Sequence, residues 1–285
     1  MIGRASSLPG ATSRPSSVPL PLLPVPFLKA LSFFLTLVAP GSLQAWPAPI
    51  YRNMVYDTLL IMPPALQRVL WRNEAYLLKG VFGLEGEMAS ALARDGLAGT
   101  LSPHTARAVE QRVQGTAEQV NQRRPFQEVA VELGKLLRIA ADLADPTVVG
   151  AGDPQLARAS GEFHRFVTLH LEEFPLVYDW SLPSTVEGAS VAALLDRLTS
   201  ASRSSVPVLV SAFWKDGQLV PATAFDYRSV PYASASLGYS RGVTAASYLW
   251  LAAWEEANGD FTGYRFFRNE GQDSSTRSKM EKARP

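Results

Sequence analysis

Apolar side chains recur along this chain mostly at the spacing of α-helices. From Phe126 onward they follow an i, i+3, i+4, i+7 pattern, and the stripe comprises Phe126, Val129, Ala130, Leu133, Leu136, Leu137 and Ala140. Such a stripe is typical of an amphipathic helix that packs one face on a core. By the same criterion, we expect further helices over residues 51–62, 64–81, 104–119, 155–171, 186–200 and 242–258.

Capping residues predict where two of these helices begin and end. Ser184 and Glu187 have the spacing of a capping box, which marks a helix start, and Gly259 follows the last helix as a C-cap. The segment 206–214 is ambiguous, because its valine-rich composition suits a strand while its length also fits a short buried helix. Alternating strand patterns are otherwise missing and no internal repeat is visible, so the sequence predicts a single all-α domain.

The first 45 residues have the order of a secretory signal. An apolar run over residues 30–39 is followed by Pro40-Gly41, and the charged residues before it are all basic: Arg4, Arg14 and Lys29. The run is too short to span a bilayer comfortably. We therefore expect residues 1–45 to be a signal peptide, cleaved after Ala45, and the protein to be exported to the periplasm or the extracellular space. The alternative is an uncleaved N-terminal membrane anchor, because Leu43 is bulky for the minus-three position and the leader is long.

The rest of the chain divides into one domain and a tail. Residues 268–285 mix charges with Ser, Gln and Gly and lack apolar periodicity, so we expect this tail to be disordered. Residues 46–267 are long enough to bury a large core as one helical domain. The chain has no cysteine, which excludes disulfides and thiolate metal sites.

Net charge argues against a general nucleic-acid binder. The leader holds three of the 27 Lys and Arg residues and none of the 26 Asp and Glu residues, so the mature chain would carry 24 basic and 26 acidic residues. Sequence-independent binding to nucleic acid needs a concentration of positive charge. The sequence therefore gives no specific signal for nucleic acid.

Cleavage after Ala45 would make Trp46 the first residue of the mature protein. A free N-terminal amine next to its own backbone carbonyl forms a five-membered chelate ring, so a buried N-terminal residue can be a bidentate metal ligand. The alternative is that Trp46 is a packing anchor, as amphipathic aromatic residues commonly are.

Four parts of the chain carry a resemblance to a known family: Trp46, Pro63-Pro64-Ala65-Leu66, the helix that follows as far as Lys79-Gly80, and the segment 249–258 with its Ala-Trp pair. In these parts the chain resembles the zinc-dependent phospholipases C and single-strand-specific nucleases. The resemblance covers most of residues 46–267. It implies an all-helical fold that holds three clustered zinc ions, with the amine and carbonyl of the first Trp among the ligands.

The sequence departs from the family at most of the metal-binding positions. The family has a His-x-x-x-Asp pair on one helix and another His six residues later, and these positions correspond here to Arg138, Asp142 and Val148. Only the aspartate is retained.

Most of the other family ligand positions also hold a different type of residue in this chain. A His-x-x-x-Glu pair falls on Ser160 and His164, the histidine expected soon after the first Trp falls on Tyr51, and an acidic ligand falls on Glu85. One further family histidine corresponds to His104 if the intervening loop is aligned in that way.

The remaining ligands are too few for three zinc ions. Trp46, Glu85, Asp142, His164 and His104 cannot complete three four-coordinate sites, even with water as a ligand. We therefore expect at most one well-held zinc ion, and zinc binding could be lost altogether.

Arg138 suggests what replaces the metal. A guanidinium is permanently charged and fits carboxylates, so Arg138 beside Asp142, and beside Glu85 if the fold brings it near, would stand where a cation stood. The alternative is an ordinary surface i,i+4 ion pair, worth about 0.5 kcal/mol or less.

Residues 238–242 match the Gly-x-Ser-x-Gly motif, with Ser240 as the candidate nucleophile. In α/β-hydrolases the catalytic histidine follows the serine. Here all histidines precede Ser240, and they are His104, His164 and His170. The sequence favours a plain turn from a loop into a helix.

Together these observations predict an exported, phospholipase C/nuclease-like helical protein that is catalytically impaired or inactive and acts by binding. Its partner would be a phospholipid headgroup or another phosphate compound, a membrane surface or a protein. The alternative is a zinc-dependent phosphoric-ester hydrolase, a phosphodiesterase whose reduced metal site uses Trp46, Glu85, Asp142 and His164. No catalytic residue is identified.

Overall fold

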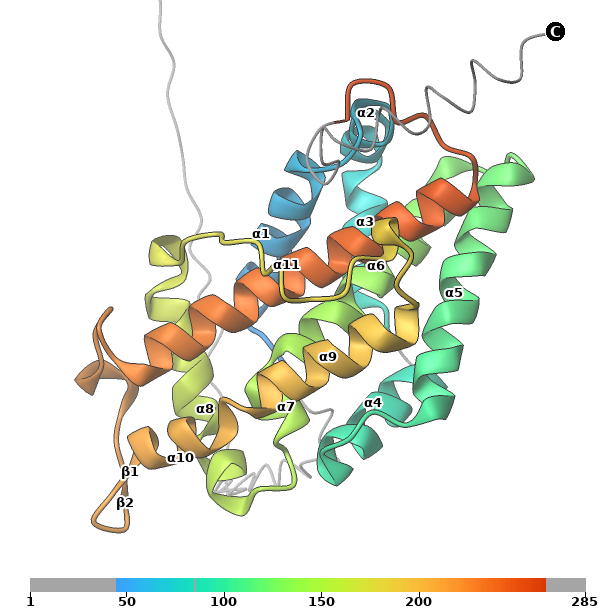
Figure 1. Ribbon diagram of the computed structural model, residues 1–285. Helices are drawn as coiled ribbons and strands as arrows, with labels where there is room; N and C mark the ends of the chain where they lie inside the picture. Colours follow the sequence, from blue (N-terminus) through green and yellow to red (C-terminus); the bar gives the residue numbers. More distant parts are fainter. Residues whose placement is uncertain (1–44, 85, 265–285) are drawn as a thin grey trace, which may run out of the picture. The chain divides into compact units, whose positions relative to one another are not determined.

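The structure is a computed structural model that describes residues 45–84 and 86–264, and this part of the chain is built mainly from α-helices (Figure 1). The all-α prediction is therefore confirmed. The α-helices are α1 (Ala48–Leu60), α2 (Pro64–Arg72), α3 (Glu74–Phe82), α4 (Glu87–Ala98), α5 (Pro103–Asn121), α6 (Phe126–Ala144), α7 (Pro146–Val149), α8 (Pro154–Leu169), α9 (Val191–Arg203), α10 (Val206–Phe213) and α11 (Val230–Glu256). Three 3-10 helices are η1 (Leu171–Glu173), η2 (Thr185–Glu187) and η3 (Ala222–Ala224), and one antiparallel hairpin joins β1 (Trp214–Lys215) to β2 (Gln218–Leu219).

Helix α6 lies at the centre of the core. It packs on α3, α5, α9 and α11, and Figure 1 shows α11 running across it. The stripe predicted from Phe126 to Ala140 faces the core, and every residue from Ile139 to Ala144 is buried. Trp250 ties α11 to α6, because its indole Nε1–H donates to the Leu133 carbonyl oxygen at 2.8 Å.

Helices α3 and α6 approach each other closely because two glycines meet where they cross. A Cβ atom on Gly80 would lie 2.0 Å from the Val131 carbonyl oxygen, and one on Gly134 would lie 2.1 Å from the Leu77 carbonyl oxygen. Neither position has room for a methyl group. This contact places the end of α3 against the middle of α6.

The expectation of a single helix over residues 64–81 is wrong, because Asn73 divides this segment into α2 and α3. The Asn73 backbone leaves helical geometry at φ −115° and ψ 21°, and its side-chain amide donates to the Val69 carbonyl oxygen at 2.8 Å. Asn side chains compete with the backbone for hydrogen bonds in this way, which favours helix ends.

The prediction of a capping box that begins at Ser184 is also wrong. Ser184 directly precedes the 3-10 helix η2 and Glu187 is the last residue of η2, and the Ser184 side chain makes no capping hydrogen bond. Helix α9 begins later, with Ser190 as N-cap, and the Ser190 hydroxyl accepts from the Ala193 N–H at 3.1 Å. Both segments offer a serine cap, and local sequence did not distinguish them.

Helix α11 begins at Val230 and not at residue 242 as expected. The glycines that suggested a turn allow close packing inside the helix instead. A Cβ on Gly238 would lie 2.9 Å from the Ala144 carbonyl oxygen, and one on Gly242 would lie 3.1 Å from Met54 Cε.

The end of α11 differs from the prediction as well. The C-cap is Ala257 and not Gly259. Asn258 takes the left-handed conformation at φ 53°, and the Gly259 N–H donates to the Trp254 carbonyl oxygen at 2.8 Å. Asn is the residue other than Gly that most readily takes this conformation.

The ambiguous segment 206–214 forms the helix α10 and then enters β1. Pro207 lies in the first turn of α10, where a proline is tolerated because the N–H there has no helical partner. Helices α4 and α7 were not predicted from the sequence.

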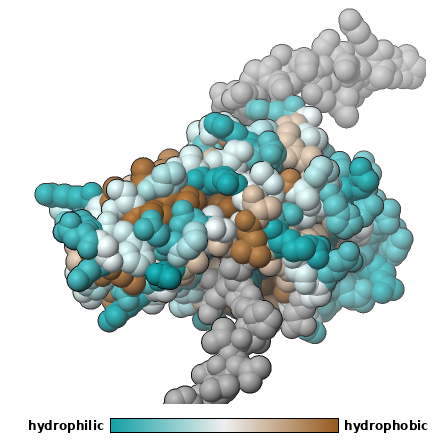
Figure 2. Space-filling model, turned by 90° about the horizontal axis from the view of Figure 1, so that it is seen from below, coloured by the Kyte–Doolittle hydropathy of each residue, from teal (hydrophilic) through white to brown (hydrophobic). Residues whose placement is uncertain are grey.

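Figure 2 shows the side of the molecule seen from below in Figure 1. Hydrophilic residues dominate its right-hand part, the side on which α5 lies in Figure 1. The exposed positions of α5 are largely polar and include Arg107, Gln111, Gln114, Glu118 and Asn121.

In residues 45–84 and 86–264, no helix is both long and apolar enough to span a bilayer. Residues 1–44, Glu85 and residues 265–285 lie outside the described part of the chain. The signal peptide over 1–45, its cleavage, the domain end at residue 267 and the tail 268–285 stay predictions.

Candidate functional site

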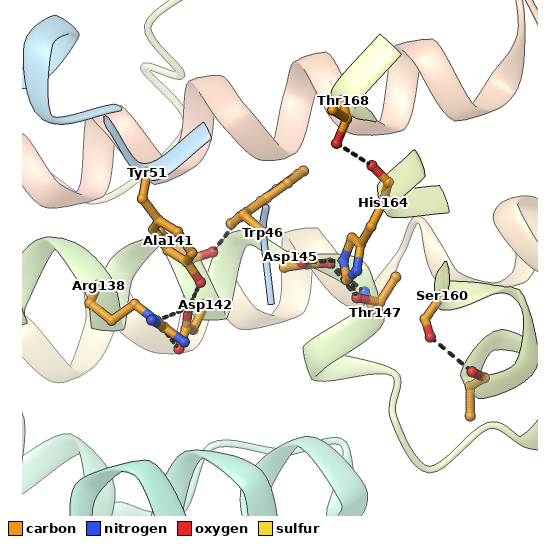
Figure 3. A network of polar contacts seen from close by, with 11 residues as sticks. Trp46, Tyr51, Arg138, Ala141, Asp142, Asp145, Thr147, Ser160, His164 and Thr168 are labelled. Carbon is orange, nitrogen blue, oxygen red and sulfur yellow. Dashed lines mark hydrogen bonds and ion pairs between the residues drawn. The ribbon is translucent and has the colours of Figure 1, made fainter. Parts of the chain in front are cut away.

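Three side chains from two helices form a polar cluster between α1 and α6, seen on the left of Figure 3. The Nε–H of Arg138 donates to both carboxylate oxygens of Asp142, one turn further along α6, at 2.8 and 2.9 Å. Tyr51 on α1 donates its hydroxyl to Asp142 Oδ1. The Arg138 Cζ atom also lies 4.5 Å from the centre of the Tyr51 ring. We call Tyr51, Arg138 and Asp142 the arginine cluster.

The arginine cluster lies largely inside the protein. The Arg138 side chain is 21% exposed and the Asp142 side chain 10% exposed, and Tyr51 is buried. Arg138 Nη1 also donates to the Val81 carbonyl oxygen near the end of α3, at 3.4 Å. The pair is therefore held by α1, α3 and α6 together, unlike an exposed i,i+4 ion pair on one helix.

Burial dominates the electrostatics of the cluster. It raises the pKa of Asp142 to about 6, although attraction to Arg138 and the hydrogen bond from Tyr51 both act to lower it. Burial and the Asp142 carboxylate raise the pKa of Tyr51 well above its usual value, so Tyr51 stays a hydrogen-bond donor. Burial lowers the pKa of Arg138, but the nearby Asp142 outweighs burial and the net shift is upward. Arg138 is therefore a permanent cation.

The raised pKa of Asp142 predicts a pH-dependent stability. The folded protein binds the Asp142 proton more tightly than the unfolded chain, so this residue contributes most stability below about pH 4 and loses its contribution as pH rises to about 6. The loss should amount to about 3 kcal/mol. Urea unfolding of the wild type and of Asp142→Asn across this range measures it. A constant difference between the two proteins would contradict the assignment.

Trp46 lies between the arginine cluster and a second polar group (Figure 3). Its indole Nε1–H donates to the Ala141 carbonyl oxygen at 2.8 Å, and its ring centre lies 6.1 Å from that of Phe163. The side chain is 2% exposed. The Trp46 side chain is thus a packing anchor next to Asp142, and metal binding by its amine and carbonyl stays a prediction.

The second polar group is Asp145, Thr147 and His164, to the right of Trp46 in Figure 3. Asp145 is fully buried as the N-cap of α7, where its Oδ1 accepts from the Thr147 N–H at 2.8 Å and the Thr147 hydroxyl at 2.7 Å. His164 Nε2 on α8 lies 3.1 Å from Asp145 Oδ2 and 3.1 Å from the Thr147 hydroxyl. The carboxylate therefore fixes the start of α7 and joins it to α8.

The sequence named four further candidate positions, and the structure describes three of them. His104 on α5 is exposed and its Nε2 lies 3.6 Å from Glu87. Ser160 donates its hydroxyl to the Ala157 carbonyl oxygen on its own helix, at 2.9 Å, and Val148 is buried in α7. Glu85 falls outside the described residues.

These residues do not fit a zinc site of the family type. Within residues 45–84 and 86–264, no group of three or more His, Asp or Glu side chains is placed to hold a metal ion. Both oxygens of Asp142 already accept from Arg138, and the Nε2 of His164 is engaged by Asp145 and Thr147. A metal at either place would have to displace these partners.

The Gly-x-Ser-x-Gly motif is not a turn, because residues 238–242 lie inside α11. The Ser240 hydroxyl donates to the Pro175 carbonyl oxygen at 3.3 Å and accepts from the Val177 N–H at 3.1 Å. Ser240 therefore anchors the segment after η1 to α11.

Sequence reasoning missed Asp145 and Thr147. The sequence Asp145-Pro146-Thr147 carried a usable signal, because an acidic or polar N-cap before a proline at the first helical position is a common helix start. That pattern indicates the cap but not the contact with His164.

Comparison with known proteins gives no family for this chain: no family model matches it, and neither a curated protein nor a solved structure matches it significantly.

Proposed function

We propose that this chain is a helical protein of the phospholipase C/nuclease type in which an arginine occupies the place of a metal ion, and that it acts by binding and not by hydrolysis. The observation that carries this proposal is the engagement of both Asp142 carboxylate oxygens by Arg138. Asp142 and Arg138 stand at the positions that resemble the family's metal-binding pair.

The chemistry of the arginine cluster supports the replacement. A guanidinium supplies the positive charge that a buried carboxylate needs, and it cannot be deprotonated at physiological pH. It offers no open coordination position and cannot activate a water molecule as a metal can. A cluster of this kind stabilises the fold at Asp142 and leaves the metal-dependent reaction without its central component.

The binding role follows from the same argument. A chain of this type that lacks metal chemistry would still offer a surface to a phosphate compound, a phospholipid headgroup, a membrane or a protein. The export of the protein belongs to the same proposal and depends on the leader over residues 1–45.

The proposal predicts a protein without stoichiometric zinc. We expect elemental analysis of the protein, purified without chelator, to find no zinc at the level of one ion per chain, in the wild type and in Asp142→Ala alike. Arg138→His is the positive control, since it frees the Asp142 oxygens and adds a nitrogen ligand at i,i+4 spacing. We expect Arg138→His to bind more zinc than the wild type.

Near-stoichiometric zinc in the wild type that disappears in Asp142→Ala would contradict the proposal. That result would favour the alternative, a zinc-dependent phosphodiesterase with a reduced metal site.

A further inference from the structure

The helices α2 and α3 each present an exposed face, with the break at Asn73 between them. Their buried positions recur every three or four residues, at Leu66, Leu70, Asn73, Leu77, Gly80 and Val81. The exposed positions follow the same spacing on the opposite side and include Arg68, Trp71, Arg72, Tyr76, Lys79 and Phe82. Side chains three or four residues apart lie on the same face of a helix. Helices α1, α2 and α3 (blue to cyan) lie together at the top of Figure 1.

The balance of charge differs between α1, α2 and α3 and the rest of the described chain. The exposed basic residues of α1, α2 and α3 are Arg52, Arg68, Arg72 and Lys79. Both acids between residues 45 and 84 are half-buried and hydrogen-bonded: Asp57 accepts from the Tyr239 hydroxyl, and Glu74 accepts from the Tyr56 hydroxyl at 2.7 Å. By contrast, residues 86–264 carry 14 Lys and Arg against 20 Asp and Glu. Residues 45–84, with four basic and two acidic residues, are therefore net positive, and residues 86–264 are net negative. One acid of the second segment, Asp260, lies near Arg68.

Aromatic side chains stand among these cations. Trp71 is 40% exposed and Tyr76 is 42% exposed, both well above what a core residue shows. The Trp71 ring stacks on Tyr56 of α1, with ring centres 5.7 Å apart and an interplanar angle of 21°. Arg52 lies one turn before Tyr56 on α1. This stacking packs the exposed indole against α1, and Arg52 of α1 interacts electrostatically with Tyr56.

We propose that this basic and aromatic face, formed by Arg52, Arg68, Trp71, Arg72, Tyr76 and Lys79, docks on an anionic lipid surface. Cations attract anionic headgroups, while Trp and Tyr rings insert their apolar bodies at headgroup level and keep their polar ends in water. The inference rests on the binding role in the proposed function but not on the loss of zinc.

Vesicle binding of the full chain tests this docking. Sedimentation with phosphatidylcholine vesicles, with and without phosphatidylserine, should show binding that depends on phosphatidylserine and weakens with added salt. Arg72→Gln/Lys79→Gln should lower the partition coefficient by roughly fivefold for each charge removed. Arg72 and Lys79 are chosen because Arg68 lies near the carboxylate of Asp260. Trp71→Ala should weaken binding further, through loss of the inserted ring.

Arg107→Gln/Arg158→Gln is the matched control. It removes two exposed arginines from α5 and α8 and changes the net charge equally. The leader and the tail are the same in both double variants, so their difference reports on the face alone. Equal losses in both variants, or no loss in either, would overturn the docking surface. Loss of binding to single-stranded DNA instead of vesicles would overturn the lipid partner.

The zinc content of Arg72→Gln/Lys79→Gln should equal that of the wild type, because neither residue belongs to the arginine cluster. Failure of the lipid experiment and failure of the zinc experiment are therefore separate results.

Discussion

Replacing Arg138 with methionine is expected to lower the free energy of unfolding by about 2 to 4 kcal/mol at neutral pH. The substitution keeps most of the apolar stem but leaves the Asp142 carboxylate buried, with the Tyr51 hydroxyl as its one remaining side-chain partner among the described residues. Removing one member of a buried ion pair is costly, because the other charge stays desolvated or must take up a proton. Urea denaturation with a linear extrapolation measures the change.

Arg124→Met, in the loop just before α6, is the matched control. Arg124 and Glu128 form an i,i+4 pair with the same spacing, but their side chains are 54% and 46% exposed. We expect a loss of about 0.5 kcal/mol or less there. The losses of unfolding free energy for the two substitutions would then differ several-fold, although both arginines pair with an acid four residues later.

The cost of Arg138→Met should also shrink at pH 5, because Asp142 has a pKa of about 6 and is largely protonated there in the wild type. If Arg138→Met and Arg124→Met cost the same, Arg138 forms an ordinary surface pair, and the proposal that it occupies the place of a metal loses its support.

Replacing Gly134 with alanine is expected to destabilise the protein by about 3 kcal/mol or more. The new methyl group would lie 2.1 Å from the Leu77 carbonyl oxygen and 3.0 Å from the Gly80 Cα, so the α3 backbone would have to move away from α6. Backbone cannot make room as a flexible side chain can. The movement would also pull on Val81, whose carbonyl oxygen accepts from Arg138.

Gly115→Ala on α5 is the control for this prediction. Apart from its chain neighbours and the local backbone of α5, no atom of the described residues lies within 4 Å of a Cβ built on Gly115. Alanine lowers the entropy of the unfolded chain and favours a helix interior, so we expect a gain of about 0.5 to 1 kcal/mol. Thermal unfolding compares the two variants. A similar melting temperature for Gly134→Ala and the wild type would contradict the close helix crossing.

Local sequence was enough to predict the helical character of the domain and the pairing of two of the three residues of the arginine cluster, Arg138 and Asp142. The apolar stripe from Phe126 identified α6, because hydrophobic periodicity depends only on neighbours within a few turns. The same local rule placed Arg138 and Asp142 on one face, since side chains four residues apart in a helix are adjacent. Helix ends were less predictable, as Asn73 and the start of α11 show, because several residues compete for each cap.

Only the tertiary structure decided the surroundings of these residues. Tyr51 and Asp142 are 91 residues apart in sequence, and the Trp46 indole bonds to a carbonyl 95 residues away. Helical periodicity states which face of a helix is buried, but not which helix covers it. Gly238 and Gly242 look like turn residues by composition, yet they lie inside α11, where the absence of a side chain lets Ala144 and Met54 approach closely. The contact of His164 with Asp145 likewise depends on how α7 and α8 meet. Local spacing thus determined the helices and the pairing of Arg138 with Asp142. The burial of this pair, on which its contribution to stability depends, is decided only by the packing of α1, α3 and α6.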